Sequence, residues 1–171
     1  QQGDILVDRQ PVKSNLLQWS KLIGYVPQSV YLLDDTIRNN VAFGIPTDEI
    51  QDEKIWDALK QARLDEYIHG LPYGLDTIVG ERGIKFSGGQ RQRIAIARTM
   101  YYDPEILVLD EATSALDDET EKAVMESIDS LQGKKTLIII AHRLSTIQKC
   151  DKIYEVVDKK IIERVKFDIF S

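Results

Sequence analysis

Two adjacent carboxylates follow an uninterrupted apolar run. Ile106–Leu109 contains only apolar residues, and Asp110 and Glu111 come directly after it. Such a run is typical of a strand that is buried on both faces in a parallel sheet. A carboxylate at the end of this strand can hold Mg²⁺ beside a nucleotide, and its neighbour can accept a proton from, or orient, an attacking water molecule. Alone, the pair is a weak signal, because acidic residues at strand ends are common as solvated polarity.

A serine and two glycines stand where a helix is predicted to begin. The segment Phe86–Gln90 reads Phe-Ser-Gly-Gly-Gln and leads into a helix predicted from 88 to 102. The first N–H groups of a helix have no intrahelical partner and carry the positive end of the helix dipole, so this start favours a terminal phosphate. The Ser87 hydroxyl adds a donor. An ordinary glycine-containing turn capped by the serine explains the pentapeptide equally well when it is read alone.

Two further polar side chains follow predicted strands. His142 comes just after the apolar run Leu137–Ala141, where an imidazole can bind a γ-phosphate and support the attacking water. Gln28 follows Pro27 and a strand predicted at 21–26, where its amide can bind Mg²⁺ or contact the same water. A single histidine or glutamine is more often an ordinary core or loop residue, so both count only together with the other motifs.

Strands and helices alternate in the second half of the chain, which argues for βαβ units. The first quarter has β-type patterns and the middle is helical, so we expect an α/β core with a helical insertion. The predicted strands are 4–8, 21–26, 105–110 and 135–141, with a hairpin of 152–157 and 161–165. The predicted helices are 37–43, 47–64, 88–102, 117–131 and 144–149, and 70–83 is predicted to be a loop. The single predicted domain divides into core residues 1–34, a helical part at 35–103 and core residues 104–171.

Composition argues against nucleic-acid binding, an internal disulfide and a membrane-spanning segment. The formal charge is −6, with 28 acidic against 22 basic residues, so the basic surplus of a nucleic-acid-binding protein is lacking. Cys150 is the only cysteine, and no internal disulfide can form. No stretch approaches the roughly 18 to 20 apolar residues that a membrane span needs, so we expect any membrane connection to come through a partner or through sequence outside these residues.

In this order and at these spacings the motifs resemble those of the ABC ATPase family, over nearly the whole chain. Five linked motifs make a chance match implausible. Tyr25–Gln28 resembles the Q-loop, Phe86–Gln90 the signature motif (usually led by Leu), Ile106–Asp110 Walker B with Glu111 as the catalytic glutamate, Ser114–Asp117 the D-loop and Ala141–Arg143 the H-loop.

The resemblance implies an α/β fold, a P-loop NTPase-like ABC ATPase core (incomplete in this chain) with an inserted α-helical subdomain. It also implies hydrolysis of ATP with Mg²⁺, by two such domains that pair head to tail. The residues implied are catalytic Glu111, His142 and Gln28; nucleotide-binding Ser87, Gly88, Gly89, Gln90 and Asp117; and, for Mg²⁺, Asp110 and Gln28.

Two other segments are similar to the exporter branch of the family. These are Thr36–Val41 and Val79–Gly83, and in exporters the second lies near the coupling helices of the membrane domain. By resemblance, Glu81 and Arg82 are candidates for transmitting motion, although a solvated ion pair explains them equally well. The expected partners are therefore a second nucleotide-binding domain and an exporter's transmembrane domain, at the cytoplasmic face of the cell (inner) membrane. Residues 84–86 are similar to certain oligosaccharide-lipid flippases, which does not identify the cargo.

The 171 residues contain no G-x-x-x-x-G-K-[ST] sequence, the loop that binds phosphates with backbone amides and a lysine. In the family this loop precedes the strand resembled by residues 4–8. We therefore expect that the chain begins inside the domain and hydrolyses negligible ATP alone. We also expect open strand edges to favour pairing of copies.

Two alternatives belong to other classes. A non-catalytic interaction module fits the lack of a phosphate loop, whereas Glu111 and His142 argue against it for a longer parent protein. A chromosome-maintenance or DNA-repair ATPase shares several motifs but has a long coiled coil between Q-loop and signature. Here 58 residues separate Gln28 from Ser87 without a heptad pattern, and the acidic charge also disfavours DNA, so we reject this second alternative.

Overall fold

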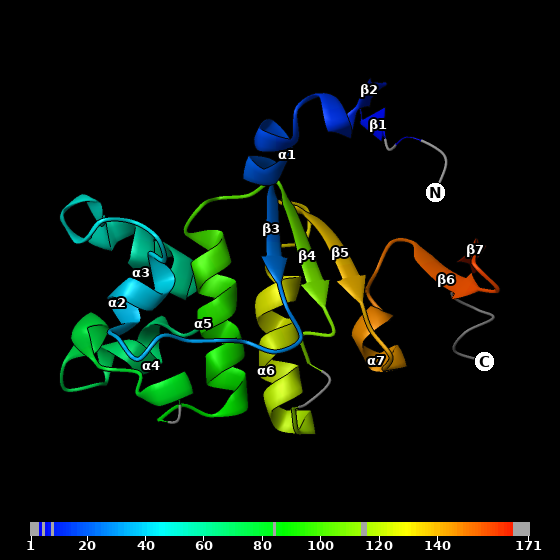
Figure 1. The fold of residues 1–171 in the computed structure, drawn as a ribbon. Helices are drawn as coiled ribbons and strands as arrows, with labels where there is room; N and C mark the ends of the chain where they lie inside the picture. The colour runs from blue at the N-terminus through cyan, green and yellow to red at the C-terminus, as the bar shows by residue number, and fades with distance from the viewer. Residues whose placement is uncertain (1–3, 5, 8, 84, 114–115, 166–171) are drawn as a thin grey trace.

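A parallel sheet of three strands lies at the centre of the molecule. The computed structural model describes residues 4, 6–7, 9–83, 85–113 and 116–165. The sheet has the order β3 (Ile23–Val26), β4 (Ile106–Asp110), β5 (Thr136–Ile140). The three strands point the same way (Figure 1), so the loops that follow them leave from one edge of the sheet.

Two long helices, α5 (Gly88–Met100) and α6 (Asp118–Asp129), contact each other beside the sheet (Figure 1). The strand residues buried on this side include Val26, Leu107 and Leu109. Gly24 permits the close approach of α5, because a Cβ on this glycine would lie 2.2 Å from Cγ2 of Thr99. On the other face, Ile23, Tyr25, Ile138 and Ile140 remain exposed among the described residues.

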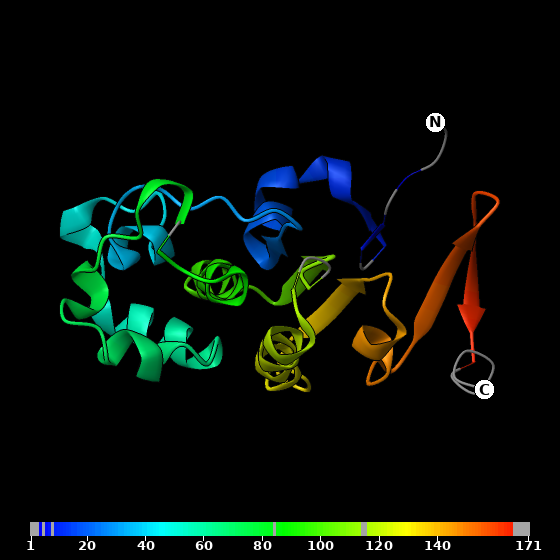
Figure 2. The ribbon, with the colours of Figure 1, turned by 90° about the horizontal axis from the view of Figure 1, so that it is seen from below.

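The middle of the chain forms a helical part on the far side of α5 (Figures 1 and 2). It consists of α2 (Ile37–Val41), η2 (Thr47–Glu49), α3 (Asp52–Gln61), α4 (Asp65–His69), η3 (Gly74–Asp76) and η4 (Glu81–Gly83). Apolar residues of α3 at helical spacing, Ile55, Ala58 and Leu59, are buried, and α3 contacts α5 extensively.

The prediction of one helix over 47–64 is wrong. Gln51 is extended at φ −105° and ψ 106°, so the short η2 turn and α3 are separate. Arg63 adopts a left-handed φ of 51°, which ends α3 and allows the unpredicted helix α4 to start at Asp65. The predicted loop at 70–83 contains the turns η3 and η4.

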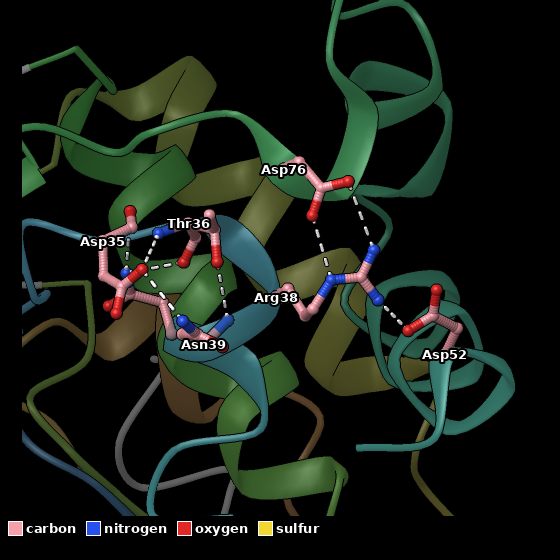
Figure 3. Close-up of polar contacts among 7 residues, drawn as sticks. Asp35, Thr36, Arg38, Asn39, Asp52 and Asp76 are labelled. Carbon is pink, nitrogen blue, oxygen red and sulfur yellow. Dashed lines mark hydrogen bonds and ion pairs between the residues drawn. The ribbon is translucent and has the colours of Figure 1, made fainter. Parts of the chain in front are cut away.

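Arg38 on α2 connects three segments of the helical part (Figure 3). Its Nε donates to Oδ1 of Asp76 at 3.0 Å, and it also pairs with Asp52 at the start of α3. The helix itself begins at Thr36, whose hydroxyl accepts from the backbone N–H of Asn39 at 3.1 Å. The N-cap of α2 and the ion pairs of Arg38 with Asp52 and Asp76 thus hold the segment that follows Gln28 in place.

Shorter elements complete the two ends of the chain. These are β1 (Leu6–Val7), β2 (Gln10–Pro11), η1 (Val12–Ser14), α1 (Leu16–Leu22), α7 (Leu144–Ile147), β6 (Ile153–Val157) and β7 (Lys160–Arg164). The strand predicted at 21–26 starts at Ile23, since Lys21 and Leu22 belong to α1, a helix that Asn15 caps. Of the strand predicted at 4–8, Leu6–Val7 forms β1, which pairs with β2 in an antiparallel manner. Ile5 and Asp8 lie outside the residues that the structure describes.

The predicted C-terminal hairpin is confirmed as β6 and β7, with Asp158 and Lys159 at positive φ in its turn. The α/β arrangement with helices inserted between β3 and β4 is confirmed as well. No helix in the described part of the chain is long and apolar enough to span a membrane.

Candidate functional site

Glu111 lies at the carboxyl edge of the sheet in an uncommon backbone conformation. Its φ is 47°, in the left-handed region that residues with a side chain seldom adopt. The backbone N–H donates to the carbonyl of Ile140, at the end of the neighbouring strand, at 2.9 Å. Such conformations persist where the surrounding structure determines them. The turn after β4 is therefore fastened to the end of β5.

The side chain of Glu111 contacts two of the residues predicted to act with it. Nε2 of Gln28 donates to its Oε2 at 2.7 Å, and Nε2 of His142 lies 2.7 Å from its Oε1. The structure thus brings all three predicted catalytic side chains together, from loops after β3, β4 and β5. The Glu111 side chain is 21% exposed and that of His142 81%. One carboxylate is therefore held between an amide and an imidazole at an edge that is open to solvent.

A small cavity of about 110 Å³ adjoins this cluster. It is lined by Glu111, Thr113, Ala141, His142, Arg143 and Thr146. A volume of this size accommodates water molecules, and the lining offers a carboxylate, an imidazole and two hydroxyls. The arrangement is suited to binding and orienting water beside a carboxylate base.

Asp110, the predicted Mg²⁺ ligand, ends β4 and accepts a hydrogen bond from the Tyr25 hydroxyl at Oδ2, at 2.6 Å. This hydrogen bond raises the pKa of Tyr25 above its ordinary value, and partial desolvation of the hydroxyl and the negative charge of Asp110 raise it further. Within the described residues, no cluster of three or more His, Cys, Asp or Glu side chains could hold a metal. A single carboxylate still fits Mg²⁺, which proteins usually bind through one or two carboxylates together with substrate phosphates.

The predicted phosphate-binding segment forms the capped start of α5. The hydroxyl of Ser87 accepts from the backbone N–H of Gln90 at 3.2 Å, and the side chain of Gln90 accepts from the backbone N–H of Ser87 at 2.8 Å. This reciprocal capping box satisfies two donors that a helix start otherwise leaves free. Ser87 and Gln90 therefore also have a structural role that does not require a ligand.

Gly89 is buried where α5 meets the start of α6. A Cβ on Gly89 would lie 1.9 Å from Cγ2 of Thr120. Thr120 in turn donates through its backbone N–H and its hydroxyl to the carboxylate of Asp117, at 3.0 and 2.7 Å. These hydrogen bonds lower the pKa of Asp117 below its ordinary value. The predicted nucleotide-binding residues of the signature and D-loop segments thus meet at two adjacent helix starts.

Several predicted positions are not part of these contacts. Gly88 has Leu116 as its near neighbour, because a Cβ there would lie 3.1 Å from that side chain. Glu81 lies exposed in η4. Ser114 and Ala115 of the D-loop, and Ile84 of the flippase-like segment, lie outside the residues that the structure describes.

Sequence reasoning missed Tyr25 as the partner of Asp110. Tyr25 pairs with Val108 in the parallel register, and Asp110 lies two residues further along β4 on the same face. Strand alternation could have placed the two side chains together. Thr113 and Thr146, which line the cavity, carried no comparable signal, because each lies in a turn or short helix whose geometry the neighbouring loops set.

Comparison with known proteins agrees with these motifs. A family model described as ABC transporter matches residues 1–114. The chain is 46% identical to YwjA of Bacillus subtilis (strain 168), an uncharacterized ABC transporter ATP-binding protein, over 95% of the chain and 28% of that protein. It is 47% identical to the ATP-dependent lipid A-core flippase of Vibrio cholerae, over 95% of the chain and 28% of that protein. The chain thus spans about 28% of the length of these curated relatives.

Among solved structures, a bacterial Atm1-family ABC exporter with ATP bound superposes with a TM-score of 0.82 and 39% identity. The match covers 98% of this chain and 30% of the exporter chain. The central strands, the inserted helices and the loops at the carboxyl edge accordingly form an incomplete ABC ATPase core with its helical subdomain. The chain belongs to the ABC transporter family.

Proposed function

We propose that this chain is part of the ATP-hydrolysing domain of an ABC exporter, in which hydrolysis is coupled to transport across a membrane. The observation that carries the proposal is the contact of Glu111 with both Gln28 and His142 at the carboxyl edge of the sheet. Three loops far apart in sequence converge on one carboxylate, as a general base and its orienting groups require.

In this proposal each residue has a separate task. Glu111 accepts a proton from the water that attacks the γ-phosphate, while Gln28 and His142 hold the Glu111 carboxylate and contact the water or the phosphate. Asp110 and Gln28 would hold Mg²⁺, which supplies charge neutralisation on the phosphates when it is bound. Before the ion binds, the hydroxyl of Tyr25 donates a hydrogen bond to the carboxylate of Asp110.

The start of α5 serves the nucleotide of the opposite subunit. Gly88 and Gly89 present helix N–H groups to a phosphate, Ser87 and Gln90 form the capped helix start that holds these groups in place, and Asp117 lies beside them at the start of α6. This division of labour requires a second nucleotide-binding domain that packs head to tail on the first.

Transport further requires a membrane-spanning partner, which we place on the exporter side of the family because the relatives include lipid A-core flippases and an Atm1-family exporter. The proposed location is the cytoplasmic face of the cell (inner) membrane. No nucleic acid is expected as a ligand, given the formal charge of −6.

The chain on its own is expected to lack ATP turnover, because its 171 residues contain no G-x-x-x-x-G-K-[ST] sequence and that loop supplies most phosphate contacts in such enzymes. Isothermal titration calorimetry with Mg-ATP tests this expectation directly, and we expect no detectable heat of binding. Clear binding would contradict it and indicate that the remaining motifs, or a second copy, complete a nucleotide site.

The catalytic part of the proposal is tested in the complete transporter that carries these residues. Glu111→Gln should lower kcat for phosphate release by about 100-fold or more and leave the KM for ATP nearly unchanged. Glu53→Gln, an exposed position on α3, is the matched control and should retain wild-type turnover. An unchanged kcat in Glu111→Gln would rule out Glu111 as the base. No turnover in the wild-type transporter would instead favour a non-catalytic interaction module.

A further inference from the structure

A buried carboxylate contacts residues that neighbour the proposed catalytic Glu111 and His142. Glu121 on α6 is 8% exposed, although it is an acidic residue. Its Oε1 accepts hydrogen bonds from the hydroxyls of Thr146, at 3.1 Å, and Thr113, at 3.4 Å. Its Oε2 accepts from the guanidinium of Arg143. Acidic side chains are seldom buried unless they are paired, and this one has three donors.

The three donors come from the two loops that carry the proposed catalytic residues. Thr113 is two residues after Glu111, and Arg143 directly follows His142. Thr146 lies in α7, the helix that Arg143 begins. The same three donors line the cavity beside Glu111 and His142. Glu121 therefore joins the turn after β4 to the turn after β5 through its two carboxylate oxygens.

Arg143 extends this connection to the D-loop segment. Its guanidinium also donates to the carbonyl of Leu116 at 3.3 Å and lies 3.7 Å from the carboxylate of Asp118. Asp118 is fully exposed, whereas the Glu121 side chain is 10% exposed. The buried partner therefore dominates, because hydrogen bonds between charged groups are stronger when solvent is excluded.

Glu111 and His142 need such a support. Glu111 has a left-handed φ of 47°, and the His142 side chain is 81% exposed and contacts Glu111 through Nε2. The contact between the two side chains therefore depends on the relative position of the turns that carry them. The spacing between their loops must therefore be set by neighbouring residues.

We propose that Glu121 is a positioning residue, which holds the turns of Glu111 and His142 at the spacing that lets their side chains meet. It does not touch substrate or metal in this scheme. Its effect on ATP turnover rests on the proposed function, but its effect on His142 does not.

Nuclear magnetic resonance of the chain with labelled histidine tests the positioning directly. The chain has two histidines; His69 stacks on Trp56 at a ring-centroid distance of 3.8 Å in the helical part and serves as an internal control. In Glu121→Gln the ring signals of His142 should shift and broaden. The amide places an NH2 donor where one carboxylate oxygen accepts, so it cannot accept from Arg143 and from the two threonine hydroxyls as the carboxylate does. The two turns then separate. The signals of His69 should stay unchanged.

Glu119→Gln is the matched control, since Glu119 is an exposed acidic residue on the same helix. It should leave both histidines unchanged. Thr146→Val removes one of the donors to Glu121 with little change in side-chain shape. It should shift the ring signals of His142 to a smaller extent. This variant provides the test if Glu121→Gln does not fold. Unmoved His142 signals in a folded Glu121→Gln or Thr146→Val chain would overturn the proposal.

A double variant tests the route through Arg143. Once Arg143→Met has removed the guanidinium, adding Glu121→Gln should change the His142 signals much less than it does in the wild-type chain, because the two residues act as a pair. Additive changes would show that Glu121 does not act through Arg143.

In the complete transporter, Glu121→Gln should lower kcat by roughly 10- to 100-fold at nearly constant KM for ATP. Displaced His142 signals without a loss of kcat would retain the positioning role and contradict the proposed function of His142 and Glu111. Unmoved His142 signals in Glu121→Gln would contradict the positioning role. Normal turnover in Glu111→Gln would contradict the proposed function, independently of the first result.

Discussion

Gln28 and Glu111 are 83 residues apart in the chain, and Nε2 of the first lies 2.7 Å from Oε2 of the second. This hydrogen bond joins the loop after β3, which leads into the helical part, to the turn after β4. The position of the loop after β3 therefore bears directly on the orientation of the Glu111 carboxylate.

Replacement of Gln28 should uncouple the two loops. In the complete transporter we expect Gln28→Ala to lower kcat by up to about 100-fold, because the Glu111 carboxylate loses one of its two orienting contacts. Gln18→Ala, at an exposed position on α1, is the control. Steady-state phosphate release provides the measurement. Wild-type kcat in Gln28→Ala would show that His142 alone orients the carboxylate.

Tyr25 should make the stability of the chain sensitive to alkaline pH. Its pKa is raised in the folded chain, chiefly by the hydrogen bond to Asp110. The contribution of this hydrogen bond to stability is therefore fully present below the unfolded pKa of about 10 and is lost as the pH rises through the higher folded value.

Chemical denaturation of the wild type and of Tyr25→Phe across this alkaline range measures the effect. We expect the wild type to lose stability more steeply with pH than Tyr25→Phe. Tyr73→Phe, at a side chain that is 75% exposed, should follow the wild-type curve. Parallel curves for wild type and Tyr25→Phe would contradict the hydrogen bond to Asp110.

Gly89 should be intolerant of any side chain for a steric reason. A Cβ would lie 1.9 Å from Cγ2 of Thr120, so Gly89→Ala should lower the free energy of unfolding by about 1–3 kcal/mol. Thr120→Ser removes that methyl group and keeps the hydroxyl that binds Asp117, so the double variant should regain most of the loss. Thermal denaturation measures both.

The matched control for this prediction is Gly70→Ala. Gly70 has an ordinary φ of −75°, and a Cβ there would lie 3.4 Å from its nearest neighbour, so the change should stay within about 0.5 kcal/mol. Failure of Thr120→Ser to rescue Gly89→Ala would show that the Cγ2 methyl group of Thr120 is not what excludes a side chain at Gly89.

Arg98 on α5 should be essential for holding the segment after Gln28. Its guanidinium donates to the carbonyl of Tyr31 at 3.0 Å, and to the carbonyl and side-chain oxygen of Asn40 at 2.7 and 3.0 Å. Burial lowers the pKa of this guanidinium, and Asn40 is fully buried. Three acceptors in fixed positions match the planar donor set of arginine.

Arg98→Lys should therefore lower the free energy of unfolding by about 1–3 kcal/mol, because an ammonium group leaves at least one buried acceptor unsatisfied. Arg9→Lys at an exposed turn is the control and should be nearly neutral. Urea denaturation provides the measurement, and equal midpoints for Arg98→Lys and wild type would show that lysine replaces all three hydrogen bonds.

The apolar runs that end in Asp110 and before His142 were sufficient to predict β4 and β5. A residue run that is apolar on both faces has few alternatives to a parallel strand. The predicted burial on both faces is not observed, because Ile138 and Ile140 of β5 are exposed. The helix starts at Thr36 and Ser87 were also readable, because a capping side chain acts on its own local backbone. Family resemblance then supplied the order of the motifs.

Other features depended on neighbours that no local pattern reveals. The helices over 47–64 divide at Gln51, where an extended residue replaces a helical one, and α1 extends over Lys21 and Leu22 up to the start of β3. The residues of both segments are compatible with a helix and with an extended conformation. Packing against the rest of the chain decides which of the two conformations each segment adopts.

The sequence by itself determined which residues can carry the chemistry, because side-chain type and position after a buried strand are local properties. Only the tertiary structure decided how they are held: that Gln28 and His142 take opposite oxygens of Glu111, and that the buried Glu121 joins the turns of Glu111 and His142. These contacts join segments distant in the chain, and their geometry follows from the register of the strands and the packing of α6, which pairwise spacing in the sequence does not specify.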